Sequence, residues 1–290
     1  MSIDPVEILI YSAMISALYA LVAIGFTMIF GVARVLNLAH GAFIMLSAYI
    51  THLAHSTGLN LYLSLALAIV GCVLFALLTC HGIISPIQGS LGAPITIMIA
   101  TLALALLLQQ GFTIAFGPTP RSLPPLVEGS SLILGTRVIN NRIVAFGVSW
   151  GLIGVLWVFM SRTRRGKAIL ATAMDARGAA LVGIDPKRIQ QLTWAISGAL
   201  AAIAGFFLAS FLTLTPQMWI DPLIIAFSIV ILGGLGSIGG SVAAAYFIGT
   251  IETFTAFTVS GTYAGLPSLL ILVLVLALRP QGFFGRIEES

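Results

Sequence analysis

The feature that most constrains this chain is the scarcity of charge along its apolar stretches. From Val35 to Pro120 there is no Asp, Glu, Lys or Arg. Charged residues make up 8% of the 290 residues, whereas soluble domains carry about 25%, and apolar residues make up 59%. Too few polar residues remain to cover a soluble protein of this size, so lipid must solvate most of the chain. We therefore predict an integral membrane protein.

Eight apolar runs divide the sequence, and a helix needs roughly 20 residues to cross a bilayer. The runs are residues 8–32, 41–54, 61–84, 95–116, 143–160, 192–214, 223–257 and 265–278. The second run is short enough to be a broken or half-span helix, and the seventh is too long for one pass and has a glycine break at its middle. The prediction is an all-α, polytopic helix bundle of about eight or nine transmembrane segments with broken helices. No stretch between the runs is long enough for a soluble domain, so residues 1–290 are expected to form a single transmembrane domain.

Composition also separates inner helices from outer ones. Small residues are dense over residues 199–205, and small residues allow helices to approach closely in lipid, so we expect an inner helix there. The leucine-rich segment 102–108 is expected to face lipid instead. Cys72 and Cys80 lie in one apolar run, and we interpret them as small apolar residues rather than as a disulfide or a metal site.

Residues 162–188, here called the basic segment, hold seven of the thirteen Lys and Arg residues of the chain. Basic loops of membrane proteins lie in the cytoplasm, so we place the basic segment there, and Arg34 on the same side. No aromatic residues interleave with this cluster, which argues against a nucleic-acid partner.

The basic segment also carries signals of regular structure. Its alanine content predicts a short helix from Lys167 to Val182, and Gly183 is a natural residue to stop that helix. Asp185 is then the expected N-cap of the next helix, with Pro186 at its first position. Such a segment is either a docking helix for a cytoplasmic partner or a plain basic loop that only fixes topology.

The sequence contains no G-x-x-x-x-G-K-[ST] loop, so this chain does not hold ATP phosphates in that way. Gly234, Gly236 and Gly239 do match G-x-G-x-x-G, but they lie in a run that belongs in lipid, without the acidic ribose partner of a dinucleotide site. A broken helix over 233–240 is the better interpretation, because unwound backbone is tolerated inside a membrane where protein or a water-filled cavity surrounds it. The glycines either line a pathway or allow close packing.

A few polar residues within the apolar runs are candidates for a translocation path. Asn37 and His40 belong to the sequence NLAHG, and a histidine within a span is costly and often functional. Both can equally serve as a hydrogen-bonded helix cap. Thr96 and Thr101 in the fourth run either line a path or bond back to their own helix.

Four stretches of the chain resemble one family. They are YALVAIGFTMIFGVARVLNLAHGAFIMLSAY (Tyr19–Tyr49), the basic segment, VILGGLGSIGGSVAAAYFIGTIE (Val230–Glu252) and LRPQGFFG (Leu278–Gly285). Together they are similar to the branched-chain amino-acid permeases of ABC transporters, and specifically to the LivH type. Ala42 departs from the pattern, since the family often has an acidic residue after His-Gly.

The resemblance implies a permease subunit of an ATP-driven importer in the bacterial plasma (inner) membrane, for branched-chain or related amino acids. Its partners would be a second permease, of the LivM type, two ATPase subunits and an extracytoplasmic solute-binding protein. The chain itself would be non-catalytic and would carry no cofactor or metal, because ATP and Mg would bind to the partner ATPase. The residues implied for ATPase coupling are Arg164, Arg165, Gly166, Lys167, Asp175, Ala179, Gly183 and Asp185. Those implied for the translocation path are Asn37, His40, Gly41, Thr96, Thr101, Gly233, Gly234, Gly236 and Gly239.

Two other functions remain open. Related permeases share these signatures, so urea or amides are alternative solutes. An ion-coupled secondary transporter is less consistent with the sequence, because ion coupling usually needs buried ionisable groups and few are present. An intramembrane enzyme would need a nucleophile and a base, and no clear set is found.

Overall fold

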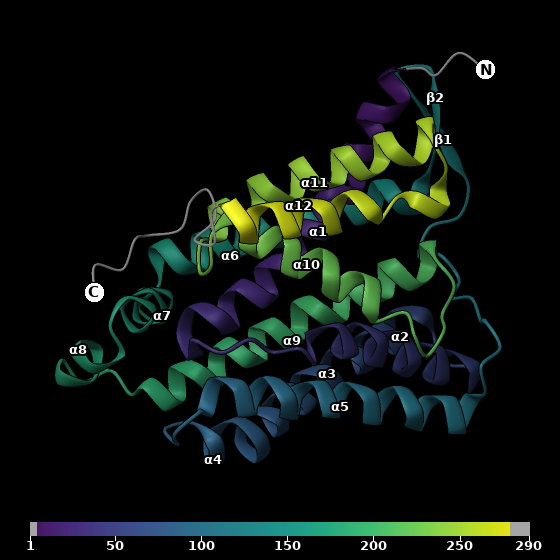
Figure 1. The fold of residues 1–290 in the computed structure, drawn as a ribbon. Helices are drawn as coiled ribbons and strands as arrows, with labels where there is room; N and C mark the ends of the chain where they lie inside the picture. The colour runs from purple at the N-terminus through teal and green to yellow at the C-terminus, as the bar shows by residue number, and fades with distance from the viewer. Residues whose placement is uncertain (1–4, 279–290) are drawn as a thin grey trace. The chain divides into compact units, whose positions relative to one another are not determined.

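The computed structural model describes residues 5–278, and helices dominate it (Figure 1). The helices are α1 (Pro5–Ala33), α2 (His40–Ser56), α3 (Leu61–Thr79), the π-helical turn η1 (Cys80–Ile84), α4 (Ser85–Ile87), α5 (Ala93–Phe116), α6 (Asn140–Arg162), α7 (Arg164–Met174), α8 (Ala176–Leu181), α9 (Pro186–Phe211), α10 (Ile220–Gly233), α11 (Ile238–Thr258), the 3-10 turn η2 (Gly261–Tyr263) and α12 (Leu266–Leu278). Two short strands, β1 (Ser130–Ile133) and β2 (Thr136–Ile139), form an antiparallel hairpin. The predicted polytopic helix bundle is confirmed. The resembling stretch Leu278–Gly285 lies, apart from Leu278, outside the described residues.

Six helices of the described chain are long and apolar enough to cross a membrane. They are Pro5–Ala33, Leu61–Ile87, Ala93–Phe116, Asn140–Arg162, Pro186–Phe211 and Gly261–Leu278. The pair α10 and α11, bent by 119°, adds a seventh if it is counted as one span. This count is lower than the eight or nine expected, because α2 has only 17 residues and the two arms of the bent pair make at most one span.

The chain divides into two compact units. The first contains the described residues of Met1–Thr27, Pro125–Val155 and Ile224–Ser290, and the second contains Met28–Pro124 and Leu156–Leu223. That both belong to a single transmembrane domain stays a prediction.

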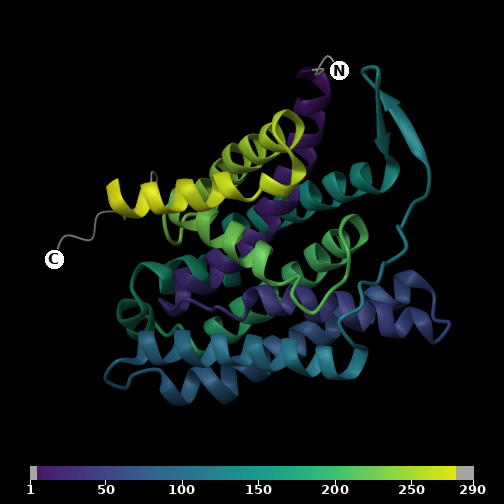
Figure 2. The same ribbon diagram turned by 45° about the vertical axis from the view of Figure 1, so that its right-hand side comes forward.

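In the second unit, α2, α3 and α9 pack against one another, and α5 lies along α2 (Figure 1 and Figure 2). Small residues make the contact of α9 with α2 close. A Cβ atom added at Gly205 would lie 2.3 Å from the carbonyl oxygen of Ile44, and the Ser47 hydroxyl donates a 2.6 Å hydrogen bond to the carbonyl of Ala202. The expected inner helix is thus confirmed. The outer position of the leucine-rich part of α5 is confirmed too, since the side chain of Leu107 is exposed.

Both cysteines, Cys72 and Cys80, are free thiols and fully buried in the second unit. The Sγ atom of Cys72 lies 3.4 Å from the carbonyl oxygen of Phe43 in α2. They fill space between helices, as the sequence predicted.

In the first unit, α1 and α11 meet through small polar residues. A Cβ atom at Gly249 would lie 2.3 Å from Ser16 Oγ, and the hydroxyls of Thr27 and Ser241 are 2.6 Å apart. The hairpin of β1 and β2 belongs to the same unit, where the hydroxyl of Tyr11 donates to the carbonyl of Arg137. Such interhelical hydrogen bonds help to hold helices together where no water is present.

Candidate coupling and translocation sites

The basic segment begins with a sharp turn between α6 and α7. Thr163 caps α7, since its Oγ1 atom accepts a 2.9 Å hydrogen bond from the backbone N–H of Gly166. A Cβ atom at Gly166 would lie 2.1 Å from the carbonyl oxygen of Phe159 and 2.5 Å from the Cα atom of Met160. Gly166 therefore allows the first turn of α7 to lie directly on the end of α6.

The prediction of one helix from Lys167 to Val182 is wrong, because the segment forms two helices, α7 and α8. Between them, Asp175 has extended backbone angles, and its carboxylate accepts a 2.9 Å hydrogen bond from the N–H of Arg177. An aspartate that bonds to nearby backbone competes with helix propagation. Asp175 is therefore the N-cap of α8. This role was not predicted, because the alanine content favoured one continuous helix.

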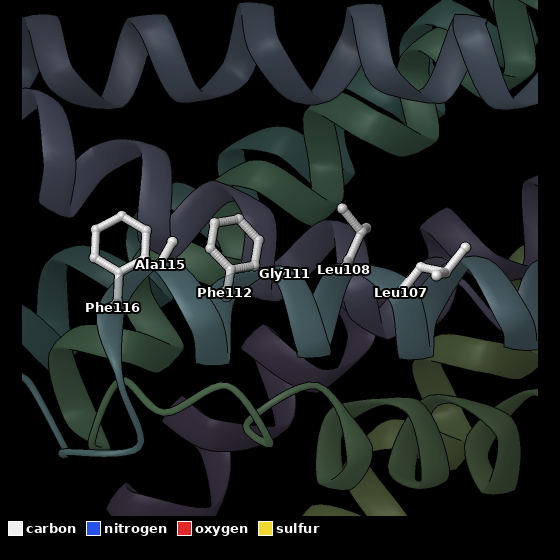
Figure 3. Close-up of a pocket in the computed structure, with 6 residues that line it drawn as sticks. All are labelled: Leu107, Leu108, Gly111, Phe112, Ala115 and Phe116. Atoms are coloured by element: carbon white, nitrogen blue, oxygen red, sulfur yellow. The ribbon is translucent and has the colours of Figure 1, made fainter.

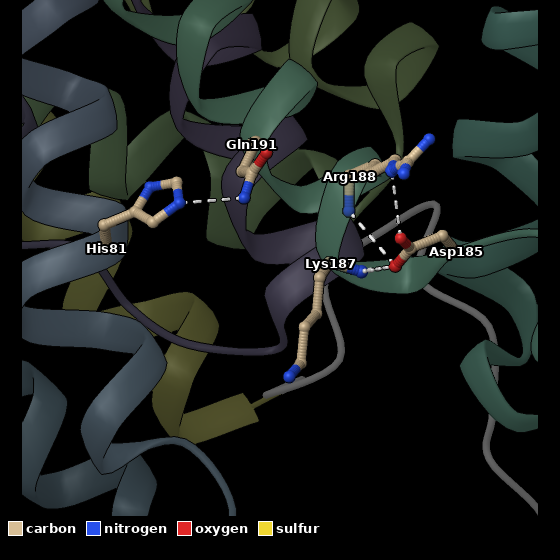
Figure 4. Close-up of polar contacts among 5 residues, drawn as sticks. All are labelled: His81, Asp185, Lys187, Arg188 and Gln191. Atoms are coloured by element: carbon tan, nitrogen blue, oxygen red, sulfur yellow. Dashed lines mark hydrogen bonds and ion pairs between the residues drawn. The ribbon is translucent and has the colours of Figure 1, made fainter.

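At the end of the basic segment, the predicted helix stop and the predicted start of the next helix are both confirmed. Gly183 has a left-handed backbone with φ of +86° and ends α8, and Pro186 is the first residue of α9. Asp185 caps α9, because one of its carboxylate oxygens accepts from the N–H groups of Lys187 and Arg188 at 3.0 and 3.4 Å (Figure 4). The ion pair of Arg188 with Asp185, at 3.2 Å, is exposed and contributes little.

Replacing Asp185 with alanine is expected to lower the free energy of unfolding by about 1 kcal/mol, because two N–H groups at the start of α9 lose their acceptor. Thermal unfolding of the purified permease in detergent measures this change. Asp185→Asn is the matched control, since asparagine retains a capping oxygen and should unfold close to the wild type. An equal loss of unfolding free energy in both variants would show that Asp185 stabilises the protein by its charge and not by capping.

The exposed surface of the basic segment combines cations with apolar side chains. Leu181 and Val182 are 90% and 77% exposed, and Met174 is exposed as well. Among the residues implied for coupling, the exposed ones are Arg164, Arg165, Lys167, Asp175, Gly183 and Asp185, whereas Gly166 and Ala179 are buried and shape the segment from within. The apolar component was not predicted from the sequence. Its signal was the pair Leu181–Val182 directly before the helix-stopping Gly183.

Arg34 connects the end of α1 to the basic segment. Its guanidinium donates a 3.0 Å hydrogen bond to the carbonyl of Ala173 in the last turn of α7. Arg34 has a positive φ of 53°, a conformation that costs a residue other than glycine roughly 1 kcal/mol. The contact confirms that Arg34 and the basic segment lie on the same side, and it gives α7 a cation at its carboxyl end, where the helix dipole favours one.

The polar residues that lead into α2 come together in the second unit. The Asn37 side-chain oxygen accepts from the N–H of Ala39 at 3.1 Å, and Thr101 Oγ1 accepts from the N–H of Leu38 at 3.1 Å. His40 lies 3.4 Å from the hydroxyl of Ser197 in α9. Thr101 therefore lies at the same turn as Asn37 and His40, and the role of these residues in a translocation path stays a prediction.

Thr96 does not join that cluster. It is exposed, and its hydroxyl donates to the carbonyl of Gly92 in the turn before it. Of the two roles predicted for Thr96, the hydrogen bond back to its own helix is therefore the one found.

The break expected over Gly233–Gly240, here called the glycine elbow, is confirmed. α10 ends at Gly233, and α11 begins at Ile238 after a bend of 119°. Gly234 and Gly236 have φ values of +86° and +87°, which glycine adopts without strain. Gly233 and Gly240 lie backbone against backbone, since a Cβ atom on Gly240 would be 2.0 Å from the carbonyl oxygen of Gly233.

Gly239 differs from its neighbours in the glycine elbow. It lies in open space within α11 and has no positive φ. The glycine elbow belongs to the first unit and the cluster at Asn37 to the second. Apart from Thr96, the residues implied for the path therefore fall into two groups, one in each unit.

A groove of about 190 Å³ lies on α5 (Figure 3). It is lined by Leu107, Leu108, Gly111, Phe112, Ala115 and Phe116. This lining offers no polar side chain to a solute, so the groove is not part of the candidate path.

Comparison with known families gives a match over almost the whole chain. The family described as the permease component of the branched-chain amino acid transport system matches residues 8–277. The chain is 29% identical, over 94% of both sequences, to the high-affinity branched-chain amino acid transport system permease protein BraD of Pseudomonas aeruginosa. It is 28% identical to the permease protein LivH of the corresponding system of Escherichia coli K12, over 93% of this chain and 92% of LivH.

A solved structure shares the fold. The chain is similar to PsaBC from Streptococcus pneumoniae, solved in complex with Fab, with a TM-score of 0.54 and 15% identity. The likeness covers 95% of this chain and 93% of the other.

Proposed function

Because this chain belongs to the family of permease components of branched-chain amino acid transport systems, we propose that it is the permease subunit of an ATP-driven importer for branched-chain or related amino acids. It is a multi-pass protein of the bacterial inner membrane. In this proposal the helices form the translocation path, and the basic segment transmits the motion of ATPase subunits to them. ATP and Mg bind to those subunits, and this chain carries no cofactor.

The observation that carries the coupling role is the exposed surface of the basic segment. Leu181 and Val182 are 90% and 77% exposed, and the cations Arg164 and Arg165 of the same segment are exposed as well. An apolar centre with a charged rim is typical of protein interfaces. A loop that only fixed topology would need the cations but not the apolar side chains.

The proposed partners are two ATPase subunits, a second permease subunit of the LivM type and an extracytoplasmic solute-binding protein. The family and the relatives support such an assembly, because their names describe components of multi-part transport systems. Urea or amides are the alternative solutes, and uptake assays with labelled leucine, urea and acetamide distinguish them.

Charge reversal in the basic segment tests the coupling role. The double variant Arg164→Glu with Arg165→Glu is expected to reduce co-purification of the ATPase subunits at least about tenfold, because two exposed cations are replaced by anions that repel the surface the arginines attracted. Arg137→Glu is the matched control, since Arg137 is an exposed arginine of the hairpin, outside the basic segment. Full retention of the ATPase by the double variant contradicts coupling through this surface. Uptake that continues without any ATPase supports an ion-coupled transporter instead.

A further inference from the structure

The amino-terminal end of α2 is buried and has no side-chain cap. The residue at the cap position is Ala39, which has no side-chain oxygen to offer. The first helical residue, His40, donates its N–H to the carbonyl of Asn37. Within the described residues, the backbone N–H groups of Gly41 and Ala42 have no acceptor, although both residues are buried. Two donors at the start of a buried helix are therefore unsatisfied.

Asn37 adds a third donor at the same place. Its side-chain oxygen is bonded to the N–H of Ala39, so its amide group lies beside the first turn of α2. The Nδ2 atom of that amide has no hydrogen-bond partner in the described chain, and the residue is only 1% exposed. Buried polar groups are nearly always hydrogen-bonded in native proteins. Three neighbouring exceptions, all of them donors, indicate a missing acceptor.

The missing acceptor is best supplied by an anionic group. The start of a helix carries a partial positive charge and presents N–H groups, so it favours an anion. A water molecule can accept from these donors, but it brings no negative charge for the helix to stabilise. A carboxylate brings two acceptor oxygens and a charge. No carboxylate occurs in the sequence from Val35 to Pro120, and Asp221, which lies between Trp219 and Leu223 in the chain, is exposed.

We propose that the Asn37 amide and the first turn of α2 bind the carboxylate of the transported amino acid. This inference rests on the proposed function and specifies the chemistry of its solute. The site is closed in this structure, because Gly41 lies against the carbonyl of Trp219, where a Cβ atom would be only 2.3 Å away. Entry of a solute requires the chain around Trp219 to move away from Gly41. An amino acid is then held by its carboxylate, while its apolar side chain contacts the surrounding helices.

The variant Asn37→Asp tests this proposal. Aspartate keeps the oxygen that accepts from Ala39 and replaces Nδ2 by a second oxygen, so it places a tethered carboxylate beside the free N–H groups. The variant should fold and assemble, with a Tm within about 2 °C of the wild type. Uptake of labelled L-leucine by the reconstituted complex should nevertheless fall at least about tenfold, because the tethered carboxylate excludes that of the solute. A purely structural asparagine would not combine retained stability with lost uptake.

Asn141→Asp is the matched control. Asn141 is likewise 1% exposed, and its side-chain oxygen accepts from the N–H of Leu126. It belongs to the first unit and not to the residues proposed for the carboxylate site, and uptake should stay within about twofold of the wild type. Unchanged uptake in Asn37→Asp would mean that water satisfies the donors, and parallel loss of uptake and Tm would mean a structural role. Either result overturns the carboxylate site. A wild-type complex that imports no amino acid refutes the proposed function itself.

Discussion

Gly240→Ala is expected to abolish uptake, because the added methyl group has no space in the glycine elbow. Its Cβ atom would lie 2.0 Å from the carbonyl oxygen of Gly233 and 2.9 Å from the carbonyl carbon. Both are backbone atoms, which yield only if the 119° bend between α10 and α11 opens. Overpacking of this kind costs about 3 kcal/mol. The measurements are thermal unfolding of the purified permease and leucine uptake by the reconstituted complex.

Gly239→Ala is the matched control for this prediction. Gly239 precedes Gly240 directly, but a Cβ atom there meets nothing within 4 Å. Alanine in a helix is more stable than glycine by roughly 0.5–1 kcal/mol, so this variant should unfold at the same or a higher temperature and retain uptake. If both variants behave alike, the close contact between Gly233 and Gly240 does not determine the bend.

Gly166→Ala is expected to have the second large effect, and to act on ATPase association. The new Cβ atom would lie 2.1 Å from the carbonyl oxygen of Phe159. The turn between α6 and α7 would have to widen, at a cost of about 1–3 kcal/mol, and α7 would be displaced with the surface that follows it. Co-purification of the ATPase subunits should therefore fall severalfold, with a correspondingly lower rate of uptake.

Gly151→Ala provides the comparison for Gly166→Ala. Gly151 is a residue of the same helix, α6, and lies in open space. Its replacement should leave ATPase association unchanged. Wild-type association in Gly166→Ala would show that the tight turn does not orient the basic segment.

The sequence predicted the elements whose signals are local. The glycine break at Gly233–Gly240 was visible because glycine alone tolerates the positive φ found at Gly234 and Gly236. Asp185 before Pro186 predicted the start of α9, because a cap depends only on the neighbouring backbone. Both features are independent of the rest of the fold.

Features that depend on tertiary contacts were not predictable in the same way. No local sequence pattern predicts the close approach of Gly166 to Phe159 or the contact of Arg34 with Ala173. The hairpin was missed because its turn uses Leu134 at a φ of 50°, where asparagine or glycine is the usual signal. In the candidate path, sequence pattern singled out Asn37 and His40, but the unsatisfied donors beside them required coordinates.

The burial of both native thiols has a practical consequence. Cys72 and Cys80 are enclosed by α2, α3 and their neighbours, so a polar maleimide reagent should leave the folded wild-type chain unmodified. A single cysteine introduced at Leu181, which is exposed, would then be the one site that the reagent reaches. Spectroscopic probes attached there could follow the movements of the basic segment during turnover, without prior removal of the natural cysteines.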